Sequence, residues 1–148
     1  MSCLTKPISG GCLCGQIRYE ASDKPKWVSY CHCRMCQKAY GQTSGIFLGF
    51  KVGLLKITKG KPKYYQSSAW AERSFCKNCG SPIGVSYKTL DSVLVGTLDN
   101  PEDWPPNECH LGIESQVKWD IIHDELPKWR TEDDPDFIKA KEVLEGSN

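Results

Sequence analysis

The sequence predicts one mainly β domain in which clustered cysteines bind metal. Short segments rich in β-branched and aromatic residues alternate with turns that contain Gly, Pro and Asn, whereas helical patterns are few. Nine cysteines occur in 148 residues, most of them at close spacing. The length suits one domain with a sizeable core, so we treat residues 1–148 as a single domain.

Eight segments have the composition and length of strands. They are residues 15–21, 27–31, 45–50, 54–60, 63–67, 72–76, 82–87 and 92–98. Helix is expected over "CRMCQKAYG" (33–41), as one turn at "PEDW" (101–104), and near the C-terminus. There Asp134 caps a helix that Pro135 begins and Gly146 ends. We interpret the acidic "TEDDPD" as a solvated linker and helix start, not as a metal site.

Charge and hydropathy limit the function classes. Lys and Arg total 19 against 18 Asp and Glu, for a net charge of +1, which argues against a nucleic-acid-binding protein. The N-terminus lacks the apolar core of a signal peptide, and no stretch approaches the roughly 18 apolar residues of a membrane span. We therefore expect a soluble, cytoplasmic protein with no nucleic-acid or membrane partner. Its oligomeric state is left open.

The cysteine spacing favours zinc over disulfides. Complete internal pairing is impossible because the number of cysteines is odd, and the cytosol keeps thiols reduced. Seven of the cysteines form a C-x-C, a C-x-C-x-x-C and a C-x-x-C-G motif: Cys12 and Cys14; Cys31, Cys33 and Cys36; Cys76 and Cys79.

The C-x-x-C-G motif predicts a zinc knuckle. Cys76 and Cys79 supply two ligands, and the glycine after them lets the chain turn behind the metal. Cys12 and Cys14, also on a Gly-flanked turn, are the natural complement. We expect a closed structural site of four thiolates, worth on the order of 10 kcal/mol of folding free energy.

The remaining motif, Cys31, Cys33 and Cys36, is one ligand short. His32 points to the opposite face if the stretch is extended. Cys109, His110 or Cys3 would close the site. The alternative is an open position that holds water or substrate, as in catalytic zinc sites. The spacing alone does not decide between the two.

Four motifs together resemble a known family. "GGCLCGQIRYE", "CHCRMCQKAYG", "FCKNCGSP" and "CHLGIESQVKW" are similar, in order and content, to the glutathione-dependent formaldehyde-activating enzymes, whose domain is shared with centromere protein V. The resemblance covers residues 9–129 and leaves residues 130–148 as a C-terminal extension with a helix. It implies an Mss-four-like fold of several coiled antiparallel sheets with zinc between them.

The resemblance also implies ligands and chemistry. A structural zinc would bind Cys12, Cys14, Cys76 and Cys79. A second, labile and catalytic zinc would bind Cys31, Cys33 and Cys36, with its last position free for a thiol. The implied reaction is that of an S-(hydroxymethyl)glutathione synthase, a carbon–sulfur lyase that adds glutathione to formaldehyde. Zinc coordination deprotonates a thiol whose ordinary pKa is about 8.5. Arg34, Lys38 and His110 are candidates to offset the negative charge of the thiolates.

His110 and Arg73 each have two interpretations, and three further residues have one. His110 is expected to orient substrate or donate a proton, or else to make a structural hydrogen bond. Arg73 is expected to bind a substrate carboxylate or to pair with an acidic neighbour. We expect Trp119 to be a packing residue and Gly41 to let backbone approach the metal loop. Cys109 and His110 are sequence neighbours, which face opposite ways in a strand, so we do not expect them to act as a dyad.

A zinc-stabilised binding module without catalysis is the alternative function. It predicts that both zinc sites are closed, or that the second is empty and collapsed, with an exposed apolar patch elsewhere. The lyase instead predicts a solvent-reachable pocket at the second site.

Overall fold

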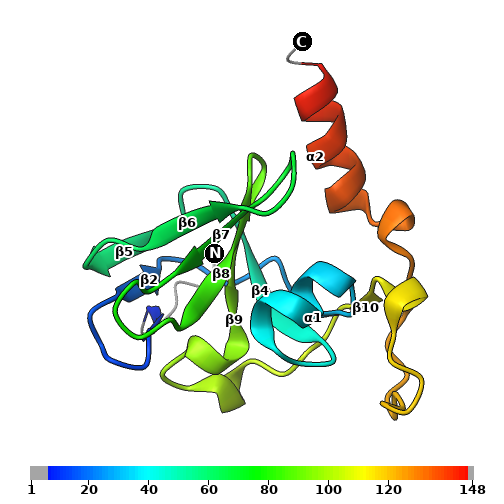
Figure 1. Ribbon diagram of the computed structural model, residues 1–148, viewed down its shortest axis with the longest axis horizontal. Helices are drawn as coiled ribbons and strands as arrows, with labels where there is room; N and C mark the ends of the chain where they lie inside the picture. The colour runs from blue at the N-terminus through cyan, green and yellow to red at the C-terminus, as the bar shows by residue number, and fades with distance from the viewer. Residues whose placement is uncertain (1–6, 147–148) are drawn as a thin grey trace.

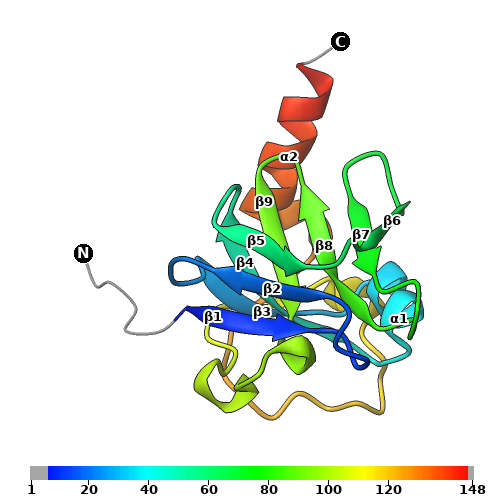
Figure 2. The same cartoon turned by 90° about the vertical axis from the view of Figure 1, so that its left-hand side faces the viewer.

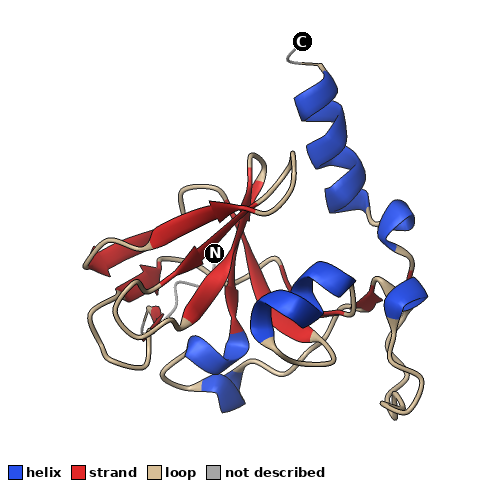
Figure 3. Cartoon of the chain, viewed as in Figure 1, coloured by secondary structure: helices blue, strands red, loops and turns tan. Residues whose placement is uncertain are grey.

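The computed structural model describes residues 7–146 and contains two β-sheets (Figures 1 and 3). The smaller sheet has the strand order β1-β2-β5, and the larger has the order β11-β10-β3-β4-β9-β8-β7-β6. The strands are β1 (Ile8–Gly11), β2 (Arg18–Ala21), β3 (Trp27–Cys31), β4 (Gly45–Lys51), β5 (Leu55–Lys59), β6 (Lys63–Gln66), β7 (Glu72–Phe75), β8 (Pro82–Tyr87), β9 (Leu90–Leu94), β10 (His110–Leu111) and β11 (Lys128–Trp129). The mainly β class is confirmed.

The smaller sheet packs across the larger one, and the main core lies between them (Figure 2). Tyr19 of β2 is fully buried there with Leu48 and Phe50 of β4. The Tyr19 hydroxyl forms a hydrogen bond with Thr97 Oγ1 at 2.7 Å. Burial of such large apolar surfaces supplies most of the driving force for folding.

Six of the eight expected strands occur with ends shifted by at most one residue, and the other two are shorter or displaced. The segment expected over 15–21 begins only at Arg18, and the one expected over 92–98 ends at Leu94, where a 3₁₀ turn follows. Three strands were not expected. β10 and β11 have only two residues each, which is too short for a periodic pattern. β1 has the sequence ISGG, which is typical of a turn.

Strand β10 is the exception to antiparallel pairing. It pairs in parallel with β3 on one side and with β11 on the other, whereas the remaining neighbours are antiparallel. The pairing places His110 beside Tyr30 and Leu111 beside Cys31. Residues far along the chain are thereby brought to the end of β3, where the second cysteine motif begins.

The helices expected over 33–41, at 101–104 and near the C-terminus form, as α1 (Arg34–Tyr40), the 3₁₀ turn η2 (Pro101–Asp103) and α2 (Pro135–Glu145). The 3₁₀ turns η1 (Val95–Thr97), η3 (Ile113–Ser115) and η4 (Thr131–Asp133) were not expected. The Asp134 side chain caps α2 by accepting hydrogen bonds from two backbone N–H groups. Figure 1 shows α2 projecting from the body of the molecule. Across residues 7–146, neither helix has the length and apolar character needed to cross a membrane.

Gly41 has a different role from the one expected. It ends α1 in the left-handed conformation, with φ of 63°, and a Cβ there would meet no atom within 4 Å. The position therefore requires glycine for helix termination and not for close approach of backbone to the cysteine loop.

We predict that Gly10→Ala destabilises the fold. A Cβ at Gly10 would lie 2.3 Å from the Tyr19 hydroxyl and 2.4 Å from the Thr97 carbonyl oxygen. Overpacking of this kind costs about 1–3 kcal/mol. Urea denaturation of the zinc-loaded protein measures the change in free energy of unfolding.

Gly96→Ala is the matched control, because a Cβ at Gly96 meets nothing within 4 Å and the backbone has no positive φ. Equal effects of the two substitutions would contradict the close packing of β1 on Tyr19.

Candidate metal centres

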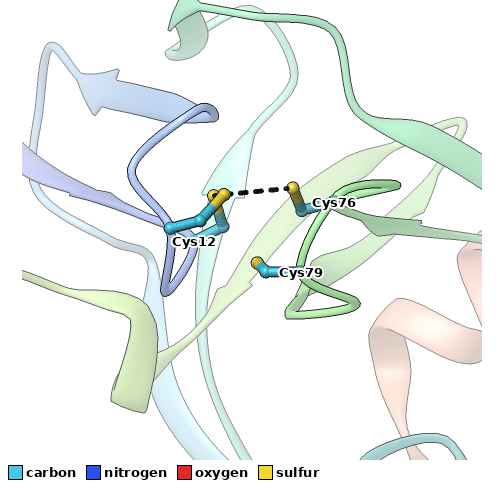
Figure 4. A group of neighbouring side chains, drawn as sticks. Cys12, Cys76 and Cys79 are labelled. Carbon is cyan, nitrogen blue, oxygen red and sulfur yellow. Dashed lines mark hydrogen bonds between the residues drawn. The ribbon is translucent and has the colours of Figure 1, made fainter.

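The first cysteine group joins two distant turns. Cys12 and Cys14 follow β1, and Cys76 and Cys79 lie between β7 and β8; their sulfur atoms are all within 4.8 Å of one another. Figure 4 shows Cys12 facing the loop that carries Cys76 and Cys79. The structure thus brings together the four residues that the sequence analysis paired.

The spacing of the sulfur atoms fits a zinc ion. Cys12 Sγ and Cys14 Sγ are 3.6 Å apart, and Cys14 Sγ and Cys76 Sγ are 3.8 Å apart. A disulfide requires about 2.05 Å, whereas four thiolates about 2.3 Å from zinc in a tetrahedron lie about 3.8 Å apart. The donor set and its spacing therefore suit tetrahedral zinc.

Backbone and hydroxyl groups hold these sulfurs in place. The Ile17 N–H lies 3.2 Å from Cys12 Sγ and donates to it. Gly80, at φ of 76°, turns the chain so that its N–H donates to the Cys76 carbonyl. The Ser81 hydroxyl lies 3.2 Å from Cys79 Sγ and lowers the pKa of that thiol to about 5. Such donors stabilise thiolates, the form that binds metal.

The second group contains three thiols. Cys31 ends β3, Cys33 is the N-cap of α1 and Cys36 lies in its first turn, and the three sulfurs are within 4.8 Å of one another. The Cys36 N–H donates to Cys33 Sγ at 3.3 Å. Within residues 7–146, no further His, Cys, Asp or Glu joins this group.

The candidates for a fourth ligand lie elsewhere. Cys109 Sγ contacts the Ser29 hydroxyl at 3.7 Å, and His32 Nε2 contacts His110 Nδ1 at 2.9 Å. Cys3 lies outside the described residues. In the described part of the chain, therefore, the group offers a metal three protein ligands, the number typical of catalytic zinc sites.

Arg73 is the cation in contact with the second group. Both of its terminal nitrogens lie 3.7 Å from Cys36 Sγ, and Nη1 donates to the Tyr40 hydroxyl at 2.7 Å. Its guanidinium also lies over the Tyr40 ring, and its Nε is buried without a hydrogen-bond partner. Among the described residues, the side chains in contact with the Arg73 guanidinium are Cys36 and Tyr40 and not a carboxylate, whereas the binding of a substrate carboxylate stays a prediction.

Arg34, Lys38 and His110 were the residues expected from the sequence to balance the charge of the thiolates, and Arg73 was not among them. Arg34 donates to the Gln37 side chain instead. Although burial disfavours its charge, Cys36 and Tyr40 raise the pKa of Arg73, so the guanidinium is charged. Hydrogen bonds from Cys31 and Cys36 lower the pKa of Cys33, whereas those from Cys33 and Cys36 raise the pKa of Cys31. Although a hydrogen bond with Cys31 lowers it, the pKa of Cys36 is raised to about 11 by Cys33 and by burial, so Cys33 is the thiol that ionises first without metal.

His110 reaches the second group only through His32. Its Nε2 lies 2.9 and 3.0 Å from the two carboxylate oxygens of Asp124, and its ring stacks on Tyr30 with centroids 4.3 Å apart. The Asp124 carboxylate accepts from His110 Nε2–H. His32 Nδ1 is buried and has no hydrogen-bond partner. Asp124 was not singled out from the sequence.

Two further residues fix the loop that carries Cys33. The buried Gln37 amide donates to the His32 carbonyl at 2.7 Å and to the Ser115 carbonyl at 2.9 Å. Gly112 has φ of 71°, and a Cβ there would lie 2.9 Å from the Cys33 backbone nitrogen. Both were missed in the sequence analysis, because only the fold brings these segments together.

A small cavity of about 50 Å³ borders the second group, and Cys31, Cys36, Phe47 and Tyr87 are among its lining residues. A neighbouring cavity of about 250 Å³ shares Trp27, Ser29, Leu111, Asp134 and Asp136 with it. The second group therefore has space beside it.

Trp119 does not pack against the second group or in the core, since its exposed fraction is 76%. The expectation of a packing role was wrong.

A sequence profile of the glutathione-dependent formaldehyde-activating enzymes matches residues 7–113. The chain belongs to this family. The match includes all seven clustered cysteines and confirms the resemblance drawn from the four motifs.

One curated protein and one solved structure are similar to this chain. An uncharacterized lyase of Schizosaccharomyces pombe is 34% identical over 80 residues, and the alignment covers 53% of this chain and 56% of the yeast protein. The chain thus spans about half the length of that relative. A crystal structure of a Rhodobacter sphaeroides protein has the same fold, with a TM-score of 0.53 and 23% identity over 64% of this chain and 93% of that one.

We predict that Gly112→Ala weakens metal binding at the second group and spares the first. A Cβ would push against the Cys33 backbone, and the positive φ adds strain. Competition with a chromogenic chelator should show the more weakly held zinc lost at least about tenfold more readily, as is usual when ligand-supporting contacts are removed.

Gly53→Ala is the matched control, since it has φ of 92° but no neighbour within 4 Å. If both variants lose zinc equally, backbone strain alone explains the effect, and the contact with Cys33 has no part in shaping the site.

Proposed function

We propose that the protein is a zinc-dependent carbon–sulfur lyase that adds a thiol, glutathione or a similar one, to formaldehyde or a related small aldehyde. The observation that carries this proposal is the second group, three thiols with no fourth protein ligand in the described chain, beside a cavity. Family membership and a lyase among the relatives support the reaction class.

The two groups take different roles in this proposal. Cys12, Cys14, Cys76 and Cys79 would hold a structural zinc, and Cys31, Cys33 and Cys36 a catalytic one. Zinc at the second group would keep a substrate thiol deprotonated and polarise the aldehyde oxygen. In the net reaction a carbon–sulfur bond forms, and the thiol proton ends on the former carbonyl oxygen, so that an S-hydroxymethyl adduct results.

The surrounding residues set the conditions for this reaction. Arg73 places a buried positive charge against Cys36, which offsets the negative charge of the thiolates. Phe47 and Tyr87 line the cavity with apolar surface that limits water. His110 acts as a positioning residue, because its bond to His32 fixes the segment between Cys31 and Cys33.

A non-catalytic, zinc-stabilised interaction module is the second candidate. Trp119 and Ile121 favour it, since they are two residues apart and their exposed fractions are 76% and 64%. Exposed apolar side chains of this size often mark contact surfaces. An interaction module needs no open metal position, so experiments on the second cysteine group distinguish the two functions.

We predict that Cys33→Ser abolishes catalysis and leaves the fold intact, whereas Cys76→Ser unfolds or aggregates the protein. The first change removes a ligand from the three-thiol group, and the second breaks the junction between two distant turns. NMR exchange spectroscopy should show that the wild-type protein accelerates interconversion of formaldehyde, thiol and adduct, with zinc content measured by atomic spectroscopy.

The comparison of Cys33→Ser with Cys76→Ser can also contradict the proposal. If Cys33→Ser lowers thermal stability as much as Cys76→Ser does, the second group is structural. If the zinc-loaded wild type gives no acceleration with any thiol, the lyase reading fails and the interaction module is favoured.

A further inference from the structure

The C-terminal extension forms one wall of the cavity beside the second cysteine group. Asp134, Asp136 and Phe137 line the same cavity as Cys31 and Cys36. All three lie at the start of α2, beyond the segment that matches the family profile. This wall is therefore built by a part of the chain that the family match does not cover.

Specific contacts hold the wall against the larger sheet. Asp136 accepts hydrogen bonds from Lys26 Nζ and from Trp27 Nε1, each at 2.7 Å. The Phe137 ring meets the Trp70 ring edge-on, with centroids 5.5 Å apart. Contacts from two separate segments thus fix the beginning of α2, although the rest of the helix projects outward in Figure 1.

The charge around the cavity is unfavourable for a carboxylate. The lining includes Asp134 and Asp136 but no Lys, Arg or His, and the neighbouring larger cavity adds Glu108 and Lys26. Lys26 is already paired with Asp136. Arg73 is directed at Cys36 and Tyr40. No basic side chain in the lining is thus left to bind an anionic group.

The remaining surface is suited to uncharged groups. Trp27, Tyr30, Phe47 and Tyr87 give the cavity an aromatic lining, which favours apolar ligand atoms. Glutathione carries a carboxylate at each end and a single ammonium group, so it approaches as an anion. Like charge on the two aspartates repels a nearby carboxylate in the partly desolvated site, and no unpaired basic side chain of the lining offsets that repulsion.

We propose that this site selects a small thiol with uncharged groups around its sulfur over glutathione, and that the start of α2 determines this selection. The proposal rests on the lyase function proposed above and narrows its substrate class. Asp134, Asp136 and Phe137 are specificity-determining residues in this view.

A matched pair of thiols tests the selection. N-acetylcysteamine and N-acetylcysteine differ by one carboxylate next to the same thiol arm. For the zinc-loaded full chain, we expect kcat/KM for adduct formation to be at least about tenfold higher with N-acetylcysteamine, after correction for the uncatalysed rate. Glutathione should behave like N-acetylcysteine. Isothermal titration calorimetry with each thiol, without aldehyde, should show the same order of affinity.

Two variants and a control test whether the start of α2 causes the preference for N-acetylcysteamine. Phe137→Arg places a cation in the lining, and Asp136→Asn removes a charge while keeping an acceptor for Trp27. Both should lower the preference for N-acetylcysteamine by several-fold, with unchanged zinc content. Ile138→Arg adds the same charge at the next residue, whose exposed fraction is 42% and which does not line the cavity, and it should leave the preference unchanged.

The outcomes separate this inference from the proposed function. If the protein accelerates adduct formation but uses N-acetylcysteine or glutathione as well as or better than N-acetylcysteamine, the proposed selection is wrong and the lyase function is retained. A preference that none of the α2 variants changes overturns the role of the wall. If no thiol is turned over, the lyase function fails, and equal calorimetric affinities would then overturn the selection as well.

Discussion

The junction of Cys12 and Cys14 with Cys76 and Cys79 is the contact on which the arrangement of the two sheets depends. It joins the turn that follows β1, in the smaller sheet, to the loop between β7 and β8, in the larger one. Four thiols at this spacing would repel one another once ionised, because like charges lie about 4 Å apart. A bound cation would convert that repulsion into a cross-link between the two sheets, which is the role proposed for a metal at these four cysteines.

The second group depends on a different set of constraints. Its three thiols lie along one short stretch of chain, but their loop is fixed by segments about 80 residues away. The parallel pairing of β10 with β3, the contact of Gly112 with Cys33 and the bond of His110 to His32 all contribute. A site held mainly by hydrogen bonds and packing can retain its fold when a ligand is exchanged, which a closed four-thiolate cross-link cannot.

Local sequence patterns predicted much of this structure, and most of the omissions have one physical cause. Strand segments, the capped helix from Pro135 and the two cysteine groups follow from periodicity and short spacing. Arg73, Asp124 and Gly112 act through partners more than 10 residues away, which no local pattern reveals. Trp119 shows the opposite error, because an aromatic residue near a motif was taken for a core residue although its loop leaves it in solvent.

The surroundings of the two groups differ in charge, and the difference is consistent with the roles proposed for them. The first is held by backbone N–H groups and a serine hydroxyl, neutral donors that stabilise four thiolates around one divalent ion. In the second, three thiolates would be balanced by a divalent ion together with the buried guanidinium of Arg73, leaving a centre that is close to neutral. In the proposed reaction, a near-neutral centre of this kind would bind an incoming thiolate without accumulating the charge of a four-thiolate site. It would also release the adduct readily, since an alkylated sulfur is a weaker ligand than a thiolate.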